Sequence, residues 1–433
     1  MSKKETATVI VGGGIIGLSI AYYLSQSPSP SPIHILETSA TLFPSASSHA
    51  AGFLTRDWYT PPLAALGALS FDLHRALAEA HGGREKWGFG RSVSSSFVEE
   101  GYDDGKGERK ERPEDWLREG VSRAEMAVGG DDGGDGGFRK GEPPKWLKAA
   151  EGGRVDVLSG EFSTANLDPH RFCHWLLQEC LSAGVVLHHP AKILSVGRDD
   201  RSEISHVIVS KAGREEKISC RRLVFAAGAW TPQAFSNLFT SSTLSLPVTA
   251  LSGHSLIVRV PTWKTPAVGT DCHAVFTTDP KGFFPEMFSR VDGTIWLGGL
   301  NSADIPLPEP CGKATAVTES LEQLRTTARR LYGNEADADN MEFVREALCF
   351  RPVNPNGLPI LARIPEGSLG DGLRTSSGGG VFVASGHGPW GISLSMGTGK
   401  VMAELIEERP TSADISGLGL QVGRKEEVLK ARL

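Results

Sequence analysis

The stretch at residues 8–24, TVIVGGGIIGLSIAYYL, constrains the fold of this chain more than any other part of the sequence. A run of β-branched residues, a glycine-rich turn and a mostly apolar segment predict a buried parallel strand that leads into a helix. Gly12, Gly14 and Gly17 match the G-x-G-x-x-G spacing in the strand–turn–helix context that this motif requires. Such glycines allow a tight turn, a close approach to a pyrophosphate and close helix packing, and the helix N-terminus offers free N–H groups to the anion. The stretch therefore predicts a dinucleotide site.

The next predicted strand, residues 33–36, ends in Glu37. An acidic residue there accepts hydrogen bonds from an adenosine ribose and repels a 2′-phosphate, which favours FAD or NAD over NADP. A glycine-rich turn in another α/β fold is the alternative, and the position of Glu37 argues against it.

The chain has 433 residues, which is enough for a nucleotide domain and a second domain. Its net charge of −6 gives no electrostatic reason to expect binding to nucleic acid or to an anionic membrane. No apolar run approaches the ~20 residues of a membrane-spanning helix, and the first strand starts too early to leave room for a signal peptide. The cysteines show no metal-ligand spacing, so we expect reduced thiols and no metal site.

The C-terminal residues Ala431-Arg432-Leu433 follow the small–basic–leucine pattern of a peroxisomal signal. They predict a peroxisomal protein that meets an import receptor, and an ordinary solvated tail in a cytoplasmic protein is the alternative. Residues 100–145 are charged and rich in glycine and proline, so we expect a mobile insertion. A calcium site is the alternative there, and the irregular ligand spacing disfavours it.

Further elements follow from local signals. Helices are predicted at 70–80, at 169–182 with Asp168 as N-cap, and at 318–332. A buried strand at 381–384 leads through a second glycine-rich turn into a helix that starts near Gly391. The N-terminus of that helix could face a group that gains negative charge during a reaction.

Four motifs together resemble the D-amino-acid-oxidase-like superfamily of FAD enzymes, in the branch of glycine oxidase, D-amino-acid dehydrogenase and sarcosine oxidase, and fungal members look most similar. These motifs are VIVGGGIIGLSIAYYL with Glu37, SSHAAGFL at 47–54, LVFAAGAW at 223–230, and the C-terminal pair LCFRPVNPNGLPIL and VFVASGHGPWGISLSMGTGK. The resemblance implies an α/β fold with a Rossmann-like FAD-binding domain, discontinuous in sequence, and an α+β substrate domain built on an antiparallel sheet. The expected boundaries are 1–60, 151–240 and 345–425 for the FAD-binding domain, 61–99 and 241–344 for the substrate domain, 100–150 for the insertion and 426–433 for the tail.

The resemblance also implies roles for residues near the flavin. Arg351 matches the arginine that holds a substrate carboxylate in the glycine-oxidase branch, and a guanidinium pairs with a carboxylate in a bidentate way. A structural ion pair is the alternative role for Arg351. Asn354 and Asn356 stand where the family often has Thr and Asp, so details of this turn can differ. Cys349 stands where sarcosine-oxidase-like members bind the flavin covalently, and simple packing is the alternative for a small buried cysteine.

His387 and Trp390 match a G-H-x-x-x-G turn that faces the pyrimidine edge of the flavin in the family. We expect His387 to orient the backbone rather than to act as an acid or base, and Trp390 either to wall the active site or to pack. His49 lies in the loop where related enzymes keep basic residues near the ring. Glu286 and Arg290 lie on a predicted strand of the second domain, and the sequence does not give their direction.

The residues expected to contact FAD lie in the turns and loops of these motifs. They are Gly12, Gly14, Ile15, Ile16, Gly17, Glu37, Ser47, Ser48, Ala51, Gly52, Ile193, Ala227, Gly228, Trp230, Cys349, Gly386, Gly388, Gly391 and Ile392.

The resulting hypothesis is oxidation of the C–N bond of an amine or amino acid by hydride transfer to flavin N5, with molecular oxygen as the electron acceptor and hydrogen peroxide as the product. One alternative is a FAD-linked dehydrogenase of a 2-hydroxy acid or similar C–OH substrate. Another is a FAD-binding regulatory protein with little turnover. A phosphate-bearing substrate would need several basic residues around the pocket.

Overall fold

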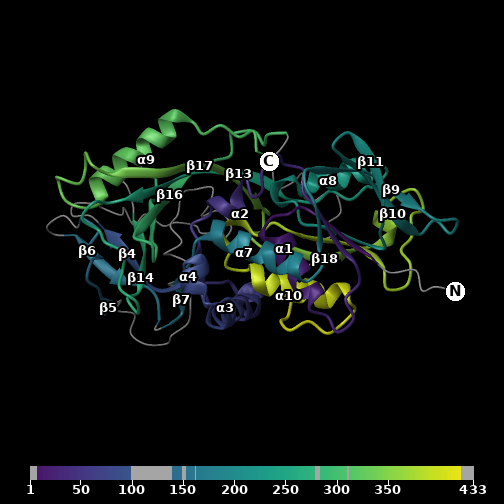
Figure 1. Ribbon diagram of the computed structural model, residues 1–433, viewed down its shortest axis with the longest axis horizontal. Helices are drawn as coiled ribbons and strands as arrows, with labels where there is room; N and C mark the ends of the chain where they lie inside the picture. The colour runs from purple at the N-terminus through teal and green to yellow at the C-terminus, as the bar shows by residue number, and fades with distance from the viewer. Residues whose placement is uncertain are drawn as a thin grey trace, which may run out of the picture.

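The computed structural model describes residues 7–98, 139–148, 153–160, 162–277, 283–309 and 312–420. Two parts built on different sheets lie side by side (Figure 1). In the described residues, no helix combines the length and apolar character that crossing a membrane requires. The peroxisomal tripeptide and residues 100–138 and 149–150 of the predicted insertion lie outside the described ranges, so both expectations stay predictions.

The nucleotide-binding sheet has six strands in the order β18-β19-β12-β1-β2-β8. All neighbours pair in parallel except β18 and β19. The strands are β1 (Thr8–Val11), β2 (Ile33–Leu36), β8 (Val186–His188), β12 (Arg222–Phe225), β18 (Ile360–Ile364) and β19 (Gly380–Ser385). Because its central strands come from the two ends and the middle of the chain, this domain is discontinuous in sequence.

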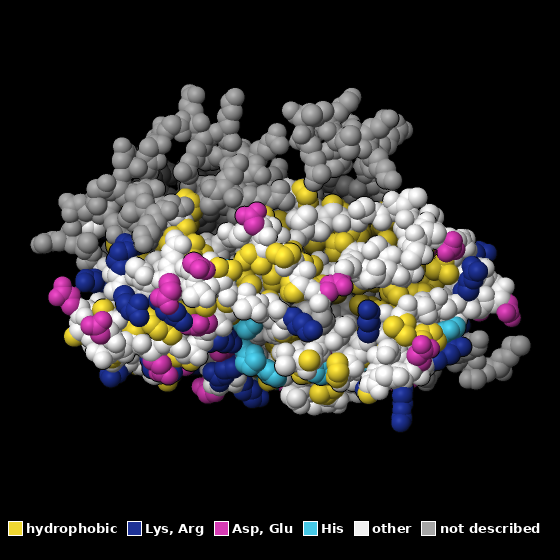
Figure 2. Space-filling model, turned by 90° about the horizontal axis from the view of Figure 1, so that it is seen from above, with side chains coloured by type: hydrophobic (Ala, Val, Ile, Leu, Met, Phe, Trp, Pro, Cys, Tyr) yellow, Lys and Arg dark blue, Asp and Glu magenta, His cyan; other side chains and the backbone are white. Residues whose placement is uncertain are grey.

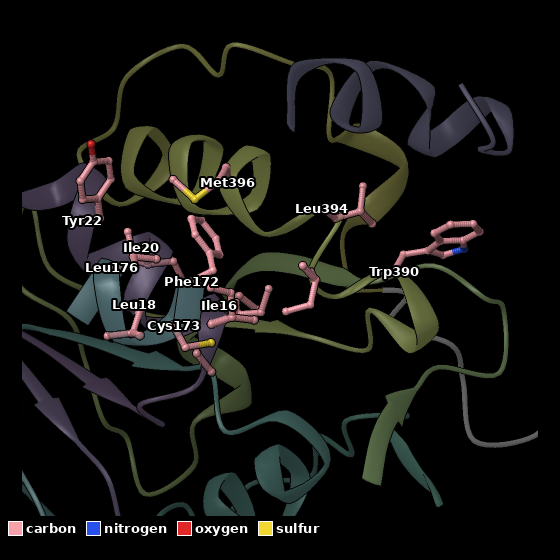
Figure 3. Close-up of a cluster of buried hydrophobic side chains, with 14 of the residues drawn as sticks. Ile16, Leu18, Ile20, Tyr22, Phe172, Cys173, Leu176, Trp390, Leu394 and Met396 are labelled. Atoms are coloured by element: carbon pink, nitrogen blue, oxygen red, sulfur yellow. The ribbon is translucent and has the colours of Figure 1, made fainter. Parts of the chain in front are cut away.

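Helices cover one face of this sheet and bury their apolar sides against one another (Figure 3). They are α1 (Ile15–Ser25), α3 (Pro61–His81), α7 (Pro169–Ser182) and α10 (Ser395–Ile406). Leu18, Phe172 and Met396 are fully buried between them, and each such side chain contributes about 1.5–3 kcal/mol by leaving water. Gly399 allows α10 to cross α1 closely, because a Cβ there would lie 2.5 Å from the backbone of Ser19.

Two helix starts bear on the sequence predictions. Asp168 caps α7 as predicted, and its side chain accepts hydrogen bonds from the backbone N–H groups of His170 and Arg171. The helix predicted at 70–80 instead begins at Pro61. Its extra turns contain Gly67, which normally weakens a helix. Here the ring of Tyr59 packs where a Cβ would be, only 2.1 Å away.

The second sheet follows the order β17-β13-β16-β15-β14-β4-β6-β5 and is antiparallel apart from the β4–β14 pair. Its strands are β4 (Gly90–Val98), β5 (Arg139–Lys140), β6 (Arg154–Val157), β13 (Thr249–Arg259), β14 (Cys272–Thr277), β15 (Glu286–Ser289), β16 (Thr294–Ser302) and β17 (Glu342–Val353). The helix α9 (Thr318–Leu331), predicted at 318–332, lies along this sheet (Figure 1). Its apolar side chains are buried in the core of the sheet. Trp146 and Leu147 are buried in the same core, so this end of the predicted insertion packs on the second sheet.

Smaller elements complete the two parts. They are α2 (Ala46–His49), α4 (Gly83–Trp87), α8 (Thr231–Leu238), the strands β3 (Phe53–Thr55) and β7 (Thr164–Asn166), and a meander of β9 (Ala191–Arg198), β10 (Ile204–Lys211) and β11 (Arg214–Ser219). Phe53 of β3 contacts the rings of Phe276 and Phe288 on the second sheet, which anchors the two parts to each other. On the face shown in Figure 2, charges of both signs are interspersed and hydrophobic side chains gather across the middle.

Candidate active site

A cavity of about 880 Å³ opens at the carboxyl edge of the nucleotide-binding sheet. The ends of β1, β2, β12 and β19 line it, and open parallel sheets bind their ligands at this edge. The end of β17, from Cys349 to Pro352, forms the wall that the second sheet contributes. The cavity therefore lies between the two parts of the molecule.

The turn between β1 and α1 has the geometry that the glycine motif predicts. Gly12 has φ +110°, and a Cβ there would lie 2.5 Å from the carbonyl oxygen of Ala226 on the neighbouring strand. A Cβ on Gly17 would lie 2.1 Å from the carbonyl oxygen of Gly12. Ser47 of α2 accepts a hydrogen bond from the backbone N–H of Ile15 at 3.0 Å. The turn is thus fixed by contacts on both sides.

The carboxylate of Glu37 is held in place at the end of β2. One oxygen accepts a hydrogen bond from the backbone N–H of Gly13 at 3.0 Å. The other accepts hydrogen bonds from the backbone N–H of Ser39 at 2.8 Å and from its hydroxyl at 2.5 Å. Each carboxylate oxygen has further acceptor capacity, so Glu37 could also accept hydrogen bonds from a ribose.

These residues fit a flavin dinucleotide. The cavity lies near the upper end of the volumes that small-molecule pockets show. Gly228 has φ +57° and a Cβ there would meet no atom within 4 Å, so the backbone of the β12 turn faces open space. Glu37, Ser47 and Gly228 would contact the adenosine and pyrophosphate, and Cys349 and Gly391 would lie by the ring.

Arg351 reaches the cavity from β17. Its Nη1 donates a hydrogen bond to Oδ1 of Asn301 at 2.5 Å. Among the described residues, no carboxylate lies within 4 Å of this guanidinium. The alternative role of Arg351, a structural ion pair, therefore has no acidic partner among the described residues.

The turn after β19 differs from the prediction. Its helix, α10, begins at Ser395 rather than near Gly391, because residues 388–390 form a 3-10 turn containing Pro389. The backbone N–H of Gly397 in the first turn of α10 donates to the hydroxyl of Ser70 on α3 at 3.0 Å. The start of α10 is therefore covered by α3, and the prediction that a helix beginning near Gly391 offers its N-terminus to the reaction is wrong.

His387 lines the cavity but is buried, and its Nε2 lies 3.1 Å from the hydroxyl of Thr398. Burial lowers its pKa to about 3, so the ring is neutral at ordinary pH. Trp390 is buried against Tyr59, with ring centroids 5.2 Å apart, at one side of the helical core (Figure 3). His49 lies outside the cavity lining, and burial with nearby Arg345 lowers its pKa to about 4.

Most of the residues predicted to contact FAD line this one cavity. They are Gly12, Gly14, Ile15, Ile16, Glu37, Ser47, Ile193, Ala227, Gly228, Trp230, Cys349, Gly388, Gly391 and Ile392. Gly17, Ser48, Ala51, Gly52 and Gly386 do not line it. Gly52, for example, packs against the segment that leads into α7, since a Cβ there would lie 1.9 Å from the carbonyl oxygen of Leu167.

Several lining residues carried no signal in the sequence. Thr38, Lys192, Gln233, Asn237 and Glu309 are polar or charged and lie on four separate segments, and Ser45 lines the cavity with them. Ser45 also accepts a hydrogen bond from the backbone N–H of Phe350 at 3.1 Å, which ties the α2 loop to β17. Only the packing of distant segments brings these residues together.

The remaining candidates lie away from the cavity lining. Arg290 is buried and pairs with Asp168, with Nη1 and Oδ2 3.4 Å apart. Glu286 is buried on β15, opposite Gly298 of β16. The described part of the chain contains no group of His, Cys, Asp or Glu residues suited to a metal ion.

Three histidines indicate a loss of stability in mild acid. Burial lowers the pKa of His49 and of His74 to about 4 and that of His387 to about 3, whereas an unfolded histidine has a pKa near 6.5. The unfolded chain therefore binds protons first, and stability falls as the pH drops below about 6.5. Between pH 7 and pH 5 each histidine should cost about 2 kcal/mol. Urea unfolding of the protein at both pH values measures this difference.

His74→Gln provides the matched control, because it removes one buried imidazole. The difference in unfolding free energy between pH 7 and pH 5 should be about 2 kcal/mol smaller in the variant, whatever its stability at pH 7. An equal difference in the variant and the original protein would contradict the assignment of this acid sensitivity to His74.

Comparisons with known proteins agree with this architecture. Residues 7–405 match the family described as FAD dependent oxidoreductase (DAO). A Schizosaccharomyces pombe protein whose name gives it no activity beyond oxidoreductase is 27% identical over 434 residues, covering 94% of this chain and 96% of the relative. Glycine oxidase of Geobacillus kaustophilus is 27% identical over 429 residues, covering 95% of each chain. D-amino acid dehydrogenase of Methylobacterium nodulans is 25% identical over 450 residues, covering 94% and 98%.

The crystal structure of glycine oxidase from Geobacillus kaustophilus has the same fold, with a TM-score of 0.67, 22% identity, and coverage of 97% of this chain and 99% of that one. The cavity at the carboxyl edge of a Rossmann-like sheet, walled by an antiparallel sheet, defines a flavin-dependent oxidoreductase of the amino-acid oxidase and dehydrogenase type. The chain belongs to the DAO family of FAD-dependent oxidoreductases.

Proposed function

We propose that this protein oxidises the C–N bond of an amino acid, or of a related amine that carries a carboxylate, and passes the electrons to oxygen to form hydrogen peroxide. The main support for the proposal is the position of Arg351. Its guanidinium reaches the cavity, and its described partner is the neutral side chain of Asn301. A bidentate arginine facing open space is suited to a carboxylate.

FAD, when bound, supplies the hydride acceptor at its N5 atom, and the residues of the chain supply orientation. Arg351 would hold the substrate carboxylate so that Cα faces the ring. Apolar lining residues such as Ile15, Phe350 and Ile392 would keep water from the reacting atoms.

Among the described lining residues, His387 is the imidazole that could be considered as a base for the substrate amine. His387 is neutral but buried, and its Nε2 already faces the hydroxyl of Thr398. The substrate would therefore react as the neutral amine after losing its proton to solvent, and the imine product would be hydrolysed by water. Hydride transfer from a neutral amine requires no strong protein base.

The charged lining of the cavity disfavours a phosphate-bearing substrate. Within the described residues, Lys192 and Arg351 are the basic side chains of the lining, and Glu37 and Glu309 are the acidic ones. Lys192 lies near Glu37, since the backbone N–H of Ala191 donates to the carbonyl oxygen of Glu37 at 2.7 Å. A single arginine by the expected ring position matches one carboxylate better than a phosphate.

Anaerobic titration of the purified protein with amino acids, secondary amines and 2-hydroxy acids tests the proposal. Loss of flavin absorbance with an amino acid or amine supports it, and subsequent oxygen consumption distinguishes an oxidase from a dehydrogenase. Loss of absorbance only with a 2-hydroxy acid would establish the C–OH alternative. FAD that no substrate reduces would favour a regulatory protein, and a protein without FAD would refute the whole assignment.

We expect FAD to be held without a covalent bond to Cys349. Burial raises the pKa of this thiol even though Arg351 lowers it, and the thiolate is the form that bonds to a flavin. Acid precipitation should therefore leave the yellow colour in the supernatant. Colour that stays in the pellet of the original protein, and moves to the supernatant in Cys349→Ala, would show a covalent link instead.

A further inference from the structure

Arg351 reaches across a neighbouring strand to find its partner. β13 lies between β17 and β16, and its Gly253 is opposite both Cys349 and Asn301. The guanidinium of Arg351 passes over Gly253, because a Cβ there would lie 2.3 Å from Nη1 and 2.9 Å from Cζ. Beyond it, Oδ1 of Asn301 accepts a hydrogen bond from Nη1 at 2.5 Å. Glycine in the middle strand and asparagine in the next one thus define the direction of the arginine.

The partner of Arg351 is a neutral amide. Some other arginines of this chain are held by carboxylates, such as Arg325 by Glu322 and Glu346, and Arg290 by Asp168. A carboxylate would direct the guanidinium equally well, but it would also neutralise its charge. An amide oxygen takes one N–H group and leaves the charge and the other N–H groups for a ligand.

We infer that Asn301 is the positioning residue that makes this site selective for substrates with a carboxylate, by holding Arg351 across Gly253 without neutralising it. This inference rests on the proposed function of Arg351. It explains why the strand between the two residues carries glycine, since any side chain there would displace the guanidinium. The substrate class it selects is an amine with an unpaired carboxylate beside Cα, in preference to an uncharged amine.

Asn301→Asp is the decisive variant, because it keeps the shape of the side chain and adds a negative charge next to Arg351. The side chain of Asn301 is exposed, so the change should not disturb folding. We expect carboxylate ligands to bind on the order of 30-fold more weakly, since the arginine is already paired. Uncharged ligands should bind as before. Asn301→Leu, which loses the hydrogen bond but keeps the arginine charge free, should weaken carboxylates only a few-fold.

Binding can be measured without turnover, from the change in flavin absorbance on adding phenylacetate or its uncharged amide, phenylacetamide, to the FAD-loaded protein. The ratio of the two dissociation constants reports the selectivity. Asn340→Asp is the matched control, because it makes the same chemical change at an exposed turn outside the cavity. FAD content and Tm of each variant show whether the fold is intact.

The outcomes separate this inference from the proposal it rests on. If Asn301→Asp removes the preference for phenylacetate, Asn301→Leu reduces it a few-fold by loss of the hydrogen bond alone, and Asn340→Asp retains it, the positioning role is established. If both variants keep the preference of the original protein, the inference is overturned while the role of Arg351 stands. If the original protein binds phenylacetate and phenylacetamide equally, Arg351 is not a carboxylate site and both are refuted. If Asn301→Asp weakened the binding of phenylacetate and phenylacetamide equally, the inference would also be overturned, because Asn301 would then have only a structural role.

Discussion

Replacing Arg351 with methionine should lower kcat/KM for an amino-acid substrate on the order of 10³-fold. Methionine has a comparable length but neither charge nor N–H donors, so the substrate carboxylate would enter the cavity without a partner. Truncating one member of a hydrogen-bonded charge pair costs roughly 2–5 kcal/mol, and each 1.4 kcal/mol is a factor of ten. Steady-state kinetics with the substrate found by anaerobic titration measures the effect.

Arg351→Lys distinguishes charge from geometry. Lysine keeps the positive charge but cannot form the bidentate pair or span Gly253 with a planar group. We therefore expect an intermediate loss for this variant, and normal FAD content in both. If Arg351→Met retained full kcat/KM, the carboxylate role would be refuted. If it lost FAD as well, the arginine would serve the cofactor rather than the substrate.

Replacing Gly12 with alanine should weaken FAD binding at least about 100-fold. The backbone at Gly12 has φ +110°, and the new methyl group would lie 2.5 Å from the carbonyl oxygen of Ala226. Neither atom can rotate away, because both belong to the backbone of packed segments. The turn must therefore move away from the position that fits a pyrophosphate, at a cost of roughly 2–4 kcal/mol from conformational strain and overlap together. Titration of the apoprotein with FAD measures this loss.

Gly184→Ala is the control for the strain alone. Gly184 also has a positive φ, +87°, but a Cβ there would meet no atom within 4 Å. This variant should lose about 1 kcal/mol of stability and keep its affinity for FAD. If Gly12→Ala bound FAD as tightly as Gly184→Ala does, the close approach of the turn to β12 would not be needed for cofactor binding.

Features that depend on neighbours in the sequence could be predicted well. The β1–α1 turn, Glu37 at the end of β2 and the Asp168 cap of α7 each follow from short-range sterics and hydrogen bonding. The antiparallel second sheet was expected from the family resemblance and is confirmed. Helix boundaries that depend on distant contacts were predicted less well. α3 keeps Gly67 because Tyr59 packs on it, and the first turn of α10 is held by Ser70.

The class of cofactor could be predicted from local sequence, because a glycine-rich turn after a strand and an acidic residue after β2 have the same chemistry in any chain. The side chains around Arg351 could not be predicted in this way. Asn301 and Gly253 lie on different strands, about 50 and 100 residues before it, and meet it through sheet order and register. Such pairings depend on how strands align across a sheet, and no local pattern in any one strand specifies its partner.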